Sequence, residues 1–188
     1  MPNYKKLLGK KVYLSPVSTD DWQLYDKWTN DYELTFFYYG GRTEITPPAT
    51  GPSSLEKRAK DKNAFTIVDK ETDAVIGECA FNYEDIENRN AKIGIAIGEK
   101  EYWSNGYGSD ALRLLLDFGF NVRGYNSIHL NVYEYNERAI ACYEKVGFKR
   151  QGVWRNILTR GQKQYNCIYM DILASEYFAE DIRQEDIK

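Results

Sequence analysis

Cysteine and histidine are scarce in this sequence, and long apolar runs are missing, which excludes several classes of protein. The three cysteines, Cys79, Cys142 and Cys167, lie far apart without a CxxC spacing, which predicts reduced thiols in a cytoplasmic protein. The single histidine, His129, cannot build a metal site without partners, so we expect no metal. No apolar run reaches the roughly eighteen residues of a membrane-spanning helix, so we expect no membrane partner.

Strong charge of either sign is also missing, because the net charge is only −3. Without a basic field to attract phosphates, we expect no nucleic-acid partner. A cationic substrate is compatible with this slightly negative net charge. The length of 188 residues with 43% hydrophobic residues fits one folded domain. We therefore expect a single domain over 1–188, with its core at about 8–177 and a tail at 178–188.

Apolar periodicity and turn residues predict alternating strands and helices. The expected elements are a strand at 12–14, a helix after Ser18, an irregular aromatic segment from Asp31 to Thr50, a short helix capped by Ser53-Ser54 through Lys60, strands at 64–69, 74–83 and 91–98, a helix at 109–122, a strand at 127–133, a helix at 136–146, and strands at 149–153 and 166–173. This order predicts a mixed α/β sheet.

Asn105-Gly106-Tyr107-Gly108 lies between an expected strand and an expected helix. Glycines there allow backbone N–H groups to turn toward a ligand, and a helix N-terminus favours negative charge. The segment therefore predicts a phosphate or pyrophosphate site. A plain turn is the alternative, and the third glycine of a dinucleotide fingerprint is missing.

The helix from Asn136 to Phe148 has a second set of polar residues. Asn136 and Tyr143 are seven residues apart, so they lie on nearly the same helix face. Asn136 also suits the helix N-cap, and Tyr143 could simply pack into the core. Gly147 suits a left-handed stop, with Phe148 packing back on the last turn.

These two features, occurring in this order, resemble the GNAT superfamily of N-acetyltransferases and, within it, the branch of ribosomal-protein-alanine and spermidine/spermine acetyltransferases. The resemblance covers roughly Leu8 to Tyr177. Its motifs are the acyl-CoA pyrophosphate loop Trp103–Gly108, the stretch Asn136–Phe148 and, more weakly, Trp28-Thr29-Asn30-Asp31 and Ile168-Tyr169-Met170. It implies an α/β (α+β) fold whose mixed, mostly antiparallel sheet of about six to seven strands is splayed at the acetyl-CoA site and flanked by helices.

The resemblance also implies acetyl-CoA as cosubstrate. The backbone of Ile95, Ala96 and Ile97 would pair with the pantetheine arm like an added strand. The implied cofactor-binding residues are Ile95, Ala96, Ile97, Trp103, Ser104, Asn105, Gly106, Tyr107, Gly108, Ser109, Asn136, Tyr143 and Lys145.

Direct attack of a neutral amine on the thioester is the mechanism that we expect, with Tyr143 as general acid toward the leaving thiolate. Lys92 stands where many family members have a glutamate that serves as base. Glu78, on the neighbouring strand, is our substitute, although it could equally be a solvent-facing carboxylate.

The acceptor pocket of this family is built partly from the segment after the first helix. Here the candidates are Glu33, Phe36, Tyr38 and Tyr39. The acceptor would be a protein N-terminus, a polyamine or another small amine. Members are often dimers, so a homodimer is among the expected partners.

Two other functions stay open at this stage. One is a non-catalytic acyl-CoA-binding sensor or regulator, which the missing carboxylate at Lys92 favours and the retained Tyr143 disfavours. The other is a nucleotide- or phosphate-binding protein, which would prefer ATP or NAD over CoA.

Overall fold

The computed structural model describes residues 3–39 and 51–178, except for the side chain of Tyr39. Hydrogen bonds join eight strands of this part of the chain in the order β1-β2-β3-β4-β5-β6-β8-β7. The strands are β1 (Leu7–Leu8), β2 (Val12–Pro16), β3 (Ala64–Asp69), β4 (Val75–Asp85), β5 (Asn90–Ile97), β6 (Ser127–Tyr133), β7 (Lys149–Arg160) and β8 (Lys163–Leu173). The helices are α1 (Trp22–Asn30), α2 (Tyr32–Tyr39), α3 (Glu56–Ala59), α4 (Tyr107–Asp117) and α5 (Glu137–Val146).

The predicted mixed sheet with flanking helices is confirmed. The pairs β1–β2, β2–β3, β3–β4, β6–β8 and β7–β8 are antiparallel, and β5–β6 is parallel. The eighth strand is β1, whose two residues pair with Leu14 and Tyr13. A strand of two residues leaves no alternation of apolar and polar side chains to detect, so the sequence predicted only seven.

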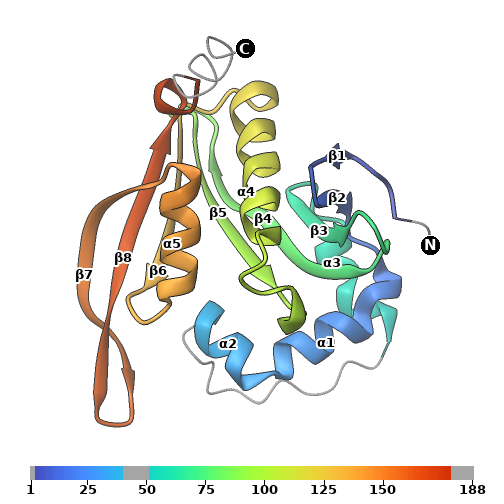
Figure 1. Cartoon of the computed structure of the whole chain (residues 1–188), viewed down its shortest axis with the longest axis horizontal. Coiled ribbons are helices and arrows are strands. Elements are labelled where there is room, and N and C mark those ends of the chain that lie inside the picture. The colour runs from blue at the N-terminus through green and yellow to red at the C-terminus, as the bar shows by residue number, and fades with distance from the viewer. Residues whose placement is uncertain (1–2, 40–50, 179–188) are drawn as a thin grey trace. The chain divides into compact units, whose positions relative to one another are not determined.

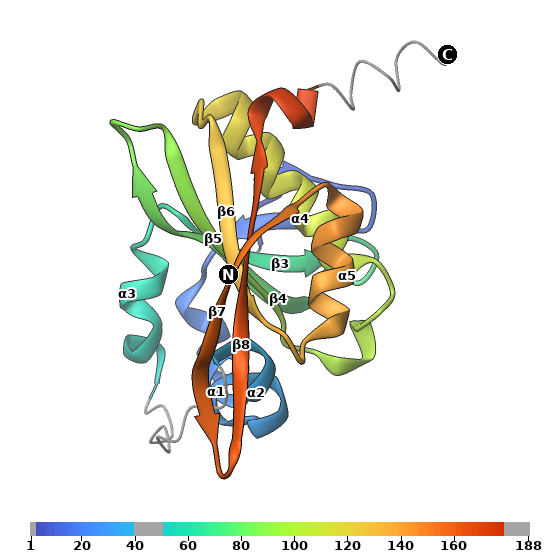
Figure 2. The same ribbon diagram turned by 90° about the vertical axis from the view of Figure 1, so that its left-hand side faces the viewer.

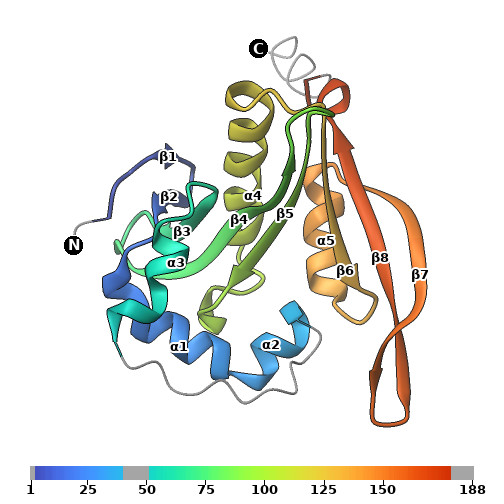
Figure 3. The same ribbon diagram turned by 180° about the vertical axis from the view of Figure 1, so that it is seen from behind.

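The chain divides into two compact units, and each is described by itself. The first unit comprises Met1–Ala80 with Gly94–Leu114. All six residues of β3 are buried, including the polar Thr66 and Asp69. Within this unit α3 lies on one face of the strands and the first turns of α4 lie on the other (Figure 2; Figure 3).

The second unit comprises Phe81–Ile93 with Leu115–Lys188. Buried and half-buried residues alternate along β6, with Ile128, Leu130 and Val132 buried. Helix α5 lies along one face of β6 and β8 (Figure 1). The hairpin of β7 and β8 is longer than predicted, because β7 continues past Gly152 through a bulge between Trp154 and Leu158.

Two local predictions were wrong. Residues Tyr32–Tyr39 form a helix rather than irregular structure; residues 40–50 of that segment lie outside the described part. Ser53 and Ser54 lie inside a 3-10 turn, Pro52–Leu55, whose N-cap is Gly51, so they do not cap the helix that follows. The described part of the chain has no helix of the length and apolarity needed to cross a membrane.

Candidate functional site

The loop that leads into α4 contains two residues with left-handed backbone conformation. Ser104 and Gly106 have positive φ angles of 61° and 84°, so the backbone changes direction twice within three residues. A Cβ atom at Gly106 would meet nothing within 4 Å, so the loop is open at this point. The first amides of a helix have no intrahelical partner, and the helix ladder here begins with the bond from Asp110 N to Gly106 O, 3.1 Å long.

Lys11 adds a positive charge beside this loop. Its Nζ donates to Asn105 O at 2.9 Å and lies 5.0 Å from the centre of the Tyr107 ring. Asp110 brings it there, because its Oδ2 accepts hydrogen bonds from the backbone of Lys11 and Val12 at 2.7 and 3.0 Å. A helix start with a neighbouring ammonium group fits a pyrophosphate. Sequence reasoning missed Lys11, because 94 residues separate it from the loop.

The end of β5 is tied to the same loop. The Trp103 indole donates its Nε1–H to Ile97 O at 2.7 Å. A Cβ at Gly77 would lie 2.3 Å from Ala96 O, so only glycine allows β4 this close to β5. The parallel pairing of β5 with β6 comprises three pairs and ends at Lys92 with His129, while β6 continues alongside β8 to Tyr133.

Helix α5 and its N-cap hold three of the predicted cofactor-binding residues, Asn136, Tyr143 and Lys145. Asn136 is its N-cap, because Oδ1 accepts from Ala139 N at 3.2 Å, so the capping role that we considered is confirmed. Gly147 ends the helix with φ 109°, and the rings of Phe148 and Tyr143 lie 5.9 Å apart, as predicted. Lys145 is exposed.

Tyr143 is half-buried, two turns from Asn136. Burial raises the pKa of its phenol above the ordinary value of 10.0, and the neighbouring Cys142 adds to this shift. A phenol with a raised pKa keeps its proton at neutral pH, which suits a proton donor and not a base.

Glu78 is held by Arg58 of α3. Its Oε2 accepts from Arg58 Nε at 3.0 Å and from Nη2 at 2.9 Å. The Glu78 side chain is 12% exposed and that of Arg58 26%. Two charge-assisted hydrogen bonds from one guanidinium fix the orientation of this carboxylate.

The candidate acceptor residues lie on α2. Glu33 Oε2 is 2.7 Å from Lys100 Nζ, and the ring of Phe36 stacks on Tyr32 with centroids 6.1 Å apart. Tyr38 is half-buried. Burial lowers the pKa of the Arg58 guanidinium, whereas Glu78 and, to a smaller extent, Tyr38 raise it. The side chain of Tyr39 lies outside the described residues.

The predicted site residues are therefore distributed over the two units. The first unit holds the loop 103–109, Ile95–Ile97, Glu78 and α2, and the second holds Asn136, Tyr143 and Lys145. Within the first unit, the structure links α2 and the loop through Lys100, which sequence reasoning also missed.

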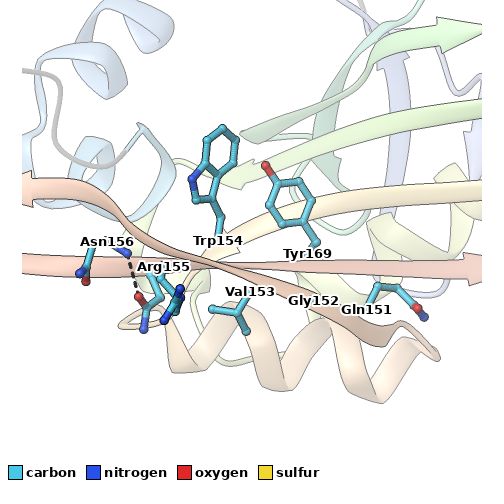
Figure 4. Close-up of a pocket in the computed structure, with 8 residues that line it drawn as sticks. Gln151, Gly152, Val153, Trp154, Arg155, Asn156 and Tyr169 are labelled. Carbon is cyan, nitrogen blue, oxygen red and sulfur yellow. Dashed lines mark hydrogen bonds between the residues drawn. The ribbon is translucent and has the colours of Figure 1, made fainter.

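A separate open groove of ≈ 1060 Å³ runs along β7 and β8. Trp154 and Tyr169 point to the same side of this hairpin (Figure 4), with ring centroids 6.5 Å apart. Its lining residues are Gln151, Gly152, Val153, Trp154, Arg155, Asn156, Asn166 and Tyr169. None of the predicted catalytic residues belongs to this lining.

Comparison with known proteins gives a consistent result. The model of the family described as "Acetyltransferase (GNAT) domain" matches residues 11–149. An uncharacterized N-acetyltransferase, p20, of Bacillus licheniformis is 35% identical over 124 residues, 66% of this chain and 67% of that protein. A second relative, the uncharacterized N-acetyltransferase YnaD of Bacillus subtilis, is 23% identical and covers 89% of this chain and 96% of its own.

Solved structures share the fold. A GNAT-family acetyltransferase from Bacillus anthracis superposes with a TM-score of 0.78 at 19% identity, covering 90% of this chain and 99% of its own. The spermidine N-acetyltransferase of Vibrio cholerae, solved with CoA and spermine, gives a TM-score of 0.75 at 21% identity, covering 89% and 98%.

Proposed function

Because this chain belongs to the GNAT acetyltransferase family, we propose that it transfers an acetyl group from acetyl-CoA to a primary amine. Acetyl-CoA supplies the acetyl group activated as a thioester. The observation that carries the proposal is the helix start behind Gly106 with Lys11 beside it, since an open loop, helix amides and an ammonium group together favour a pyrophosphate.

The cofactor-binding residues of this proposal are those of the loop and the strand before it. The amides of Ser104–Ser109 and the Lys11 ammonium hold the pyrophosphate, and the backbone of Ile95–Ile97 pairs with the pantetheine arm. Early separation of β5 from β6, after three residue pairs, supports this role of β5. Asn136 and Lys145 on α5 complete the set.

Tyr143 is the general acid of the proposed reaction. The amine attacks the acetyl carbonyl, the C–S bond breaks, and the phenol gives its proton to the leaving sulfur. The raised pKa of Tyr143 supports this role, because the proton stays on the phenol until a strong base such as a thiolate appears.

Glu78 remains the candidate that receives the proton of the attacking amine. Its charge and its place on β4, next to β5 in the sheet, support the role, whereas the two hydrogen bonds from Arg58 weaken it. A base role requires Glu78 to exchange Arg58 for the ammonium group of the acceptor.

The proposed acceptor is a protein N-terminal amine, a polyamine or another small amine, and the first two are the acceptors of the branch that the sequence resembles, the ribosomal-protein-alanine and spermidine/spermine acetyltransferases. A solved relative with the same fold is a spermidine N-acetyltransferase, which supports a polyamine as the first acceptor to test. We assign Glu33, Phe36, Tyr38 and Tyr39 to this part of the site.

An acceptor screen tests the function. The protein is incubated with acetyl-CoA and a panel of spermidine, spermine, amino acids and peptides with free N-termini, and free thiol and product mass are measured. Thiol release that depends on one acceptor class, with a mass gain of one acetyl group, is the expected result. CoA binding without release for any acceptor would instead establish the non-catalytic sensor, which the Arg58–Glu78 pair favours.

A further inference from the structure

The segment Gly98–Trp103, which joins β5 to the cofactor loop, is attached to α1 and α2 at successive positions. All of these residues belong to the first unit. The contacts follow the order of the chain, because residues 98 and 99 meet the end of α1, residue 100 meets the start of α2, and residue 103 meets its second half. We call Gly98–Trp103 the connecting segment.

Its first two residues dock against α1. A Cβ atom at Gly98 would come within 2.2 Å of the Trp28 ring, so the ring lies directly on the backbone there. The Trp28 indole donates to Glu99 Oε1 at 2.9 Å, and Lys27 Nζ lies 2.7 Å from Glu99 Oε2. Trp28 is buried, so this contact fixes the segment at one end.

Lys100 holds the start of α2. Its Nζ lies 2.8 Å from Asp31 Oδ2 and 2.7 Å from Glu33 Oε2. These side chains are between 27% and 56% exposed, and an isolated pair at such a site contributes little. Here, however, one ammonium group binds two carboxylates that flank the first residue of the helix.

Trp103 completes the attachment. Its ring meets Phe37 of α2 edge to face, with centroids 6.3 Å apart and an interplanar angle of 90°. Lys100 Nζ lies 5.9 Å from the centre of the same ring. Because Trp103 also donates to Ile97 O, this one side chain joins the start of the cofactor loop to α2 and to the end of β5.

We propose that the connecting segment couples cofactor binding to the order of α2, with Lys100 and Phe37 as positioning residues. This inference rests on the proposed function, which places CoA on Ser104–Ser109 and the acceptor on α2. When CoA binds, the cofactor loop becomes ordered. The Trp103 ring and the Lys100 backbone are then held in place, and their contacts restrain α2. By linkage, an acceptor that needs an ordered α2 binds more tightly to the CoA complex than to the free protein, and the reverse holds equally.

Hydrogen exchange with CoA as the probe tests the coupling without knowledge of the acceptor. The full chain is labelled with and without saturating CoA, and exchange is read in peptides that cover residues 32–38. In the wild-type protein CoA is expected to slow exchange in α2 by about threefold or more.

Three variants show whether the connecting segment carries the effect. Lys100→Met and Phe37→Leu are expected to bind CoA with a Kd within about threefold of wild type while α2 loses its response. Lys100→Arg keeps the charge and is expected to restore the response. Lys60→Met is the matched control, because it breaks an exposed pair with Glu56 elsewhere in the same unit and is expected to leave the response intact.

The possible results separate the two proposals. CoA binding with no change in α2, or a full response in both Lys100→Met and Phe37→Leu, overturns the coupling and leaves the proposed function standing. A complete failure of the wild-type protein to bind CoA overturns both.

Discussion

Tyr143 and Glu78 are the two side chains proposed to move protons, and their surroundings differ. Tyr143 lies on α5, where burial raises the pKa of its phenol. Glu78 lies on β4, where Arg58 donates two hydrogen bonds to its carboxylate. The first environment keeps a proton on the donor, whereas the second ties a carboxylate to a guanidinium group. Burial prepares Tyr143 for its proposed role, whereas Glu78 would first have to release Arg58.

The largest expected effect comes from Tyr143→Phe. This change removes the acidic proton but keeps the ring against Phe148, so we expect kcat to fall by ~10²–10⁴-fold while the Kd for CoA stays within a few-fold. Steady-state rates and calorimetric titration measure the two quantities. Tyr135→Phe is the control, because burial also raises the pKa of Tyr135 although it lies outside α5. An unchanged kcat in Tyr143→Phe would remove the phenol from the mechanism.

The pH–rate profile of the wild-type enzyme also tests whether Tyr143 is the general acid. General acid catalysis requires protonated Tyr143, and its pKa is raised above 10.0, so kcat should show no falling limb below pH 10. A falling limb between pH 7 and 9 would indicate another acid.

The raised pKa of Tyr143 also makes the stability of the fold depend on pH, because the unfolded chain loses its phenol proton first as pH rises above 10. The contribution of Tyr143 to the unfolding free energy is thus complete below pH 10 and is lost above it.

Removing the partner of Glu78 tests how strongly that carboxylate is fixed. Arg58→Met leaves a mostly buried carboxylate without its guanidinium, and we expect the unfolding free energy to fall by ~1–3 kcal/mol. Urea denaturation measures the loss. Lys60→Met, which breaks an exposed pair, should change the unfolding free energy far less, because solvent screens such a pair. Equal losses in the two variants would show that the Arg58–Glu78 pair is worth no more than a surface contact.

Glu78→Gln asks whether the carboxylate is also a base. Because the proposed mechanism gives Glu78 the proton of the attacking amine, we expect kcat/KM to fall by ~10²-fold at pH 8, the lower limit for a general base. The loss should shrink as pH rises and more of the amine is already neutral. A fall of less than about tenfold would show that Glu78, which Arg58 holds by two hydrogen bonds, is not the base.

The smallest effect is expected from Asn136→Ala. The change removes the N-cap of the helix that bears Tyr143 and should lower the unfolding free energy by ~1 kcal/mol. Asn136→Asp keeps a capping oxygen and should retain most of that stability. If the alanine variant also weakens CoA binding more than about tenfold, Asn136 contacts the cofactor in addition to its cap.

Much of the fold could be predicted because its signals are local. The bounds of β3 and β6 coincide with those predicted, since each is a short apolar or alternating run bounded by polar residues. The stop at Gly147 was predicted from a glycine at a helix end. Helix α2 was missed because its apolar residues have no helical periodicity and glycines and prolines follow closely.

Non-local contacts explain what could not be predicted of the site. Arg58 and Glu78 are 20 residues apart, and Lys100 and Glu33 are 67 apart. No spacing rule connects such pairs, because the fold alone brings them together. The resemblance in the loop and in α5 indicated where chemistry occurs, but it said nothing of the side chains that restrain it.

Strand β7 ends the order of strands and leaves Val153 and Trp154 57% and 55% exposed. An edge with large apolar side chains can accept a further strand from another molecule. We therefore expect concentrated samples of this protein to associate through this edge, and Val153→Lys to weaken that association.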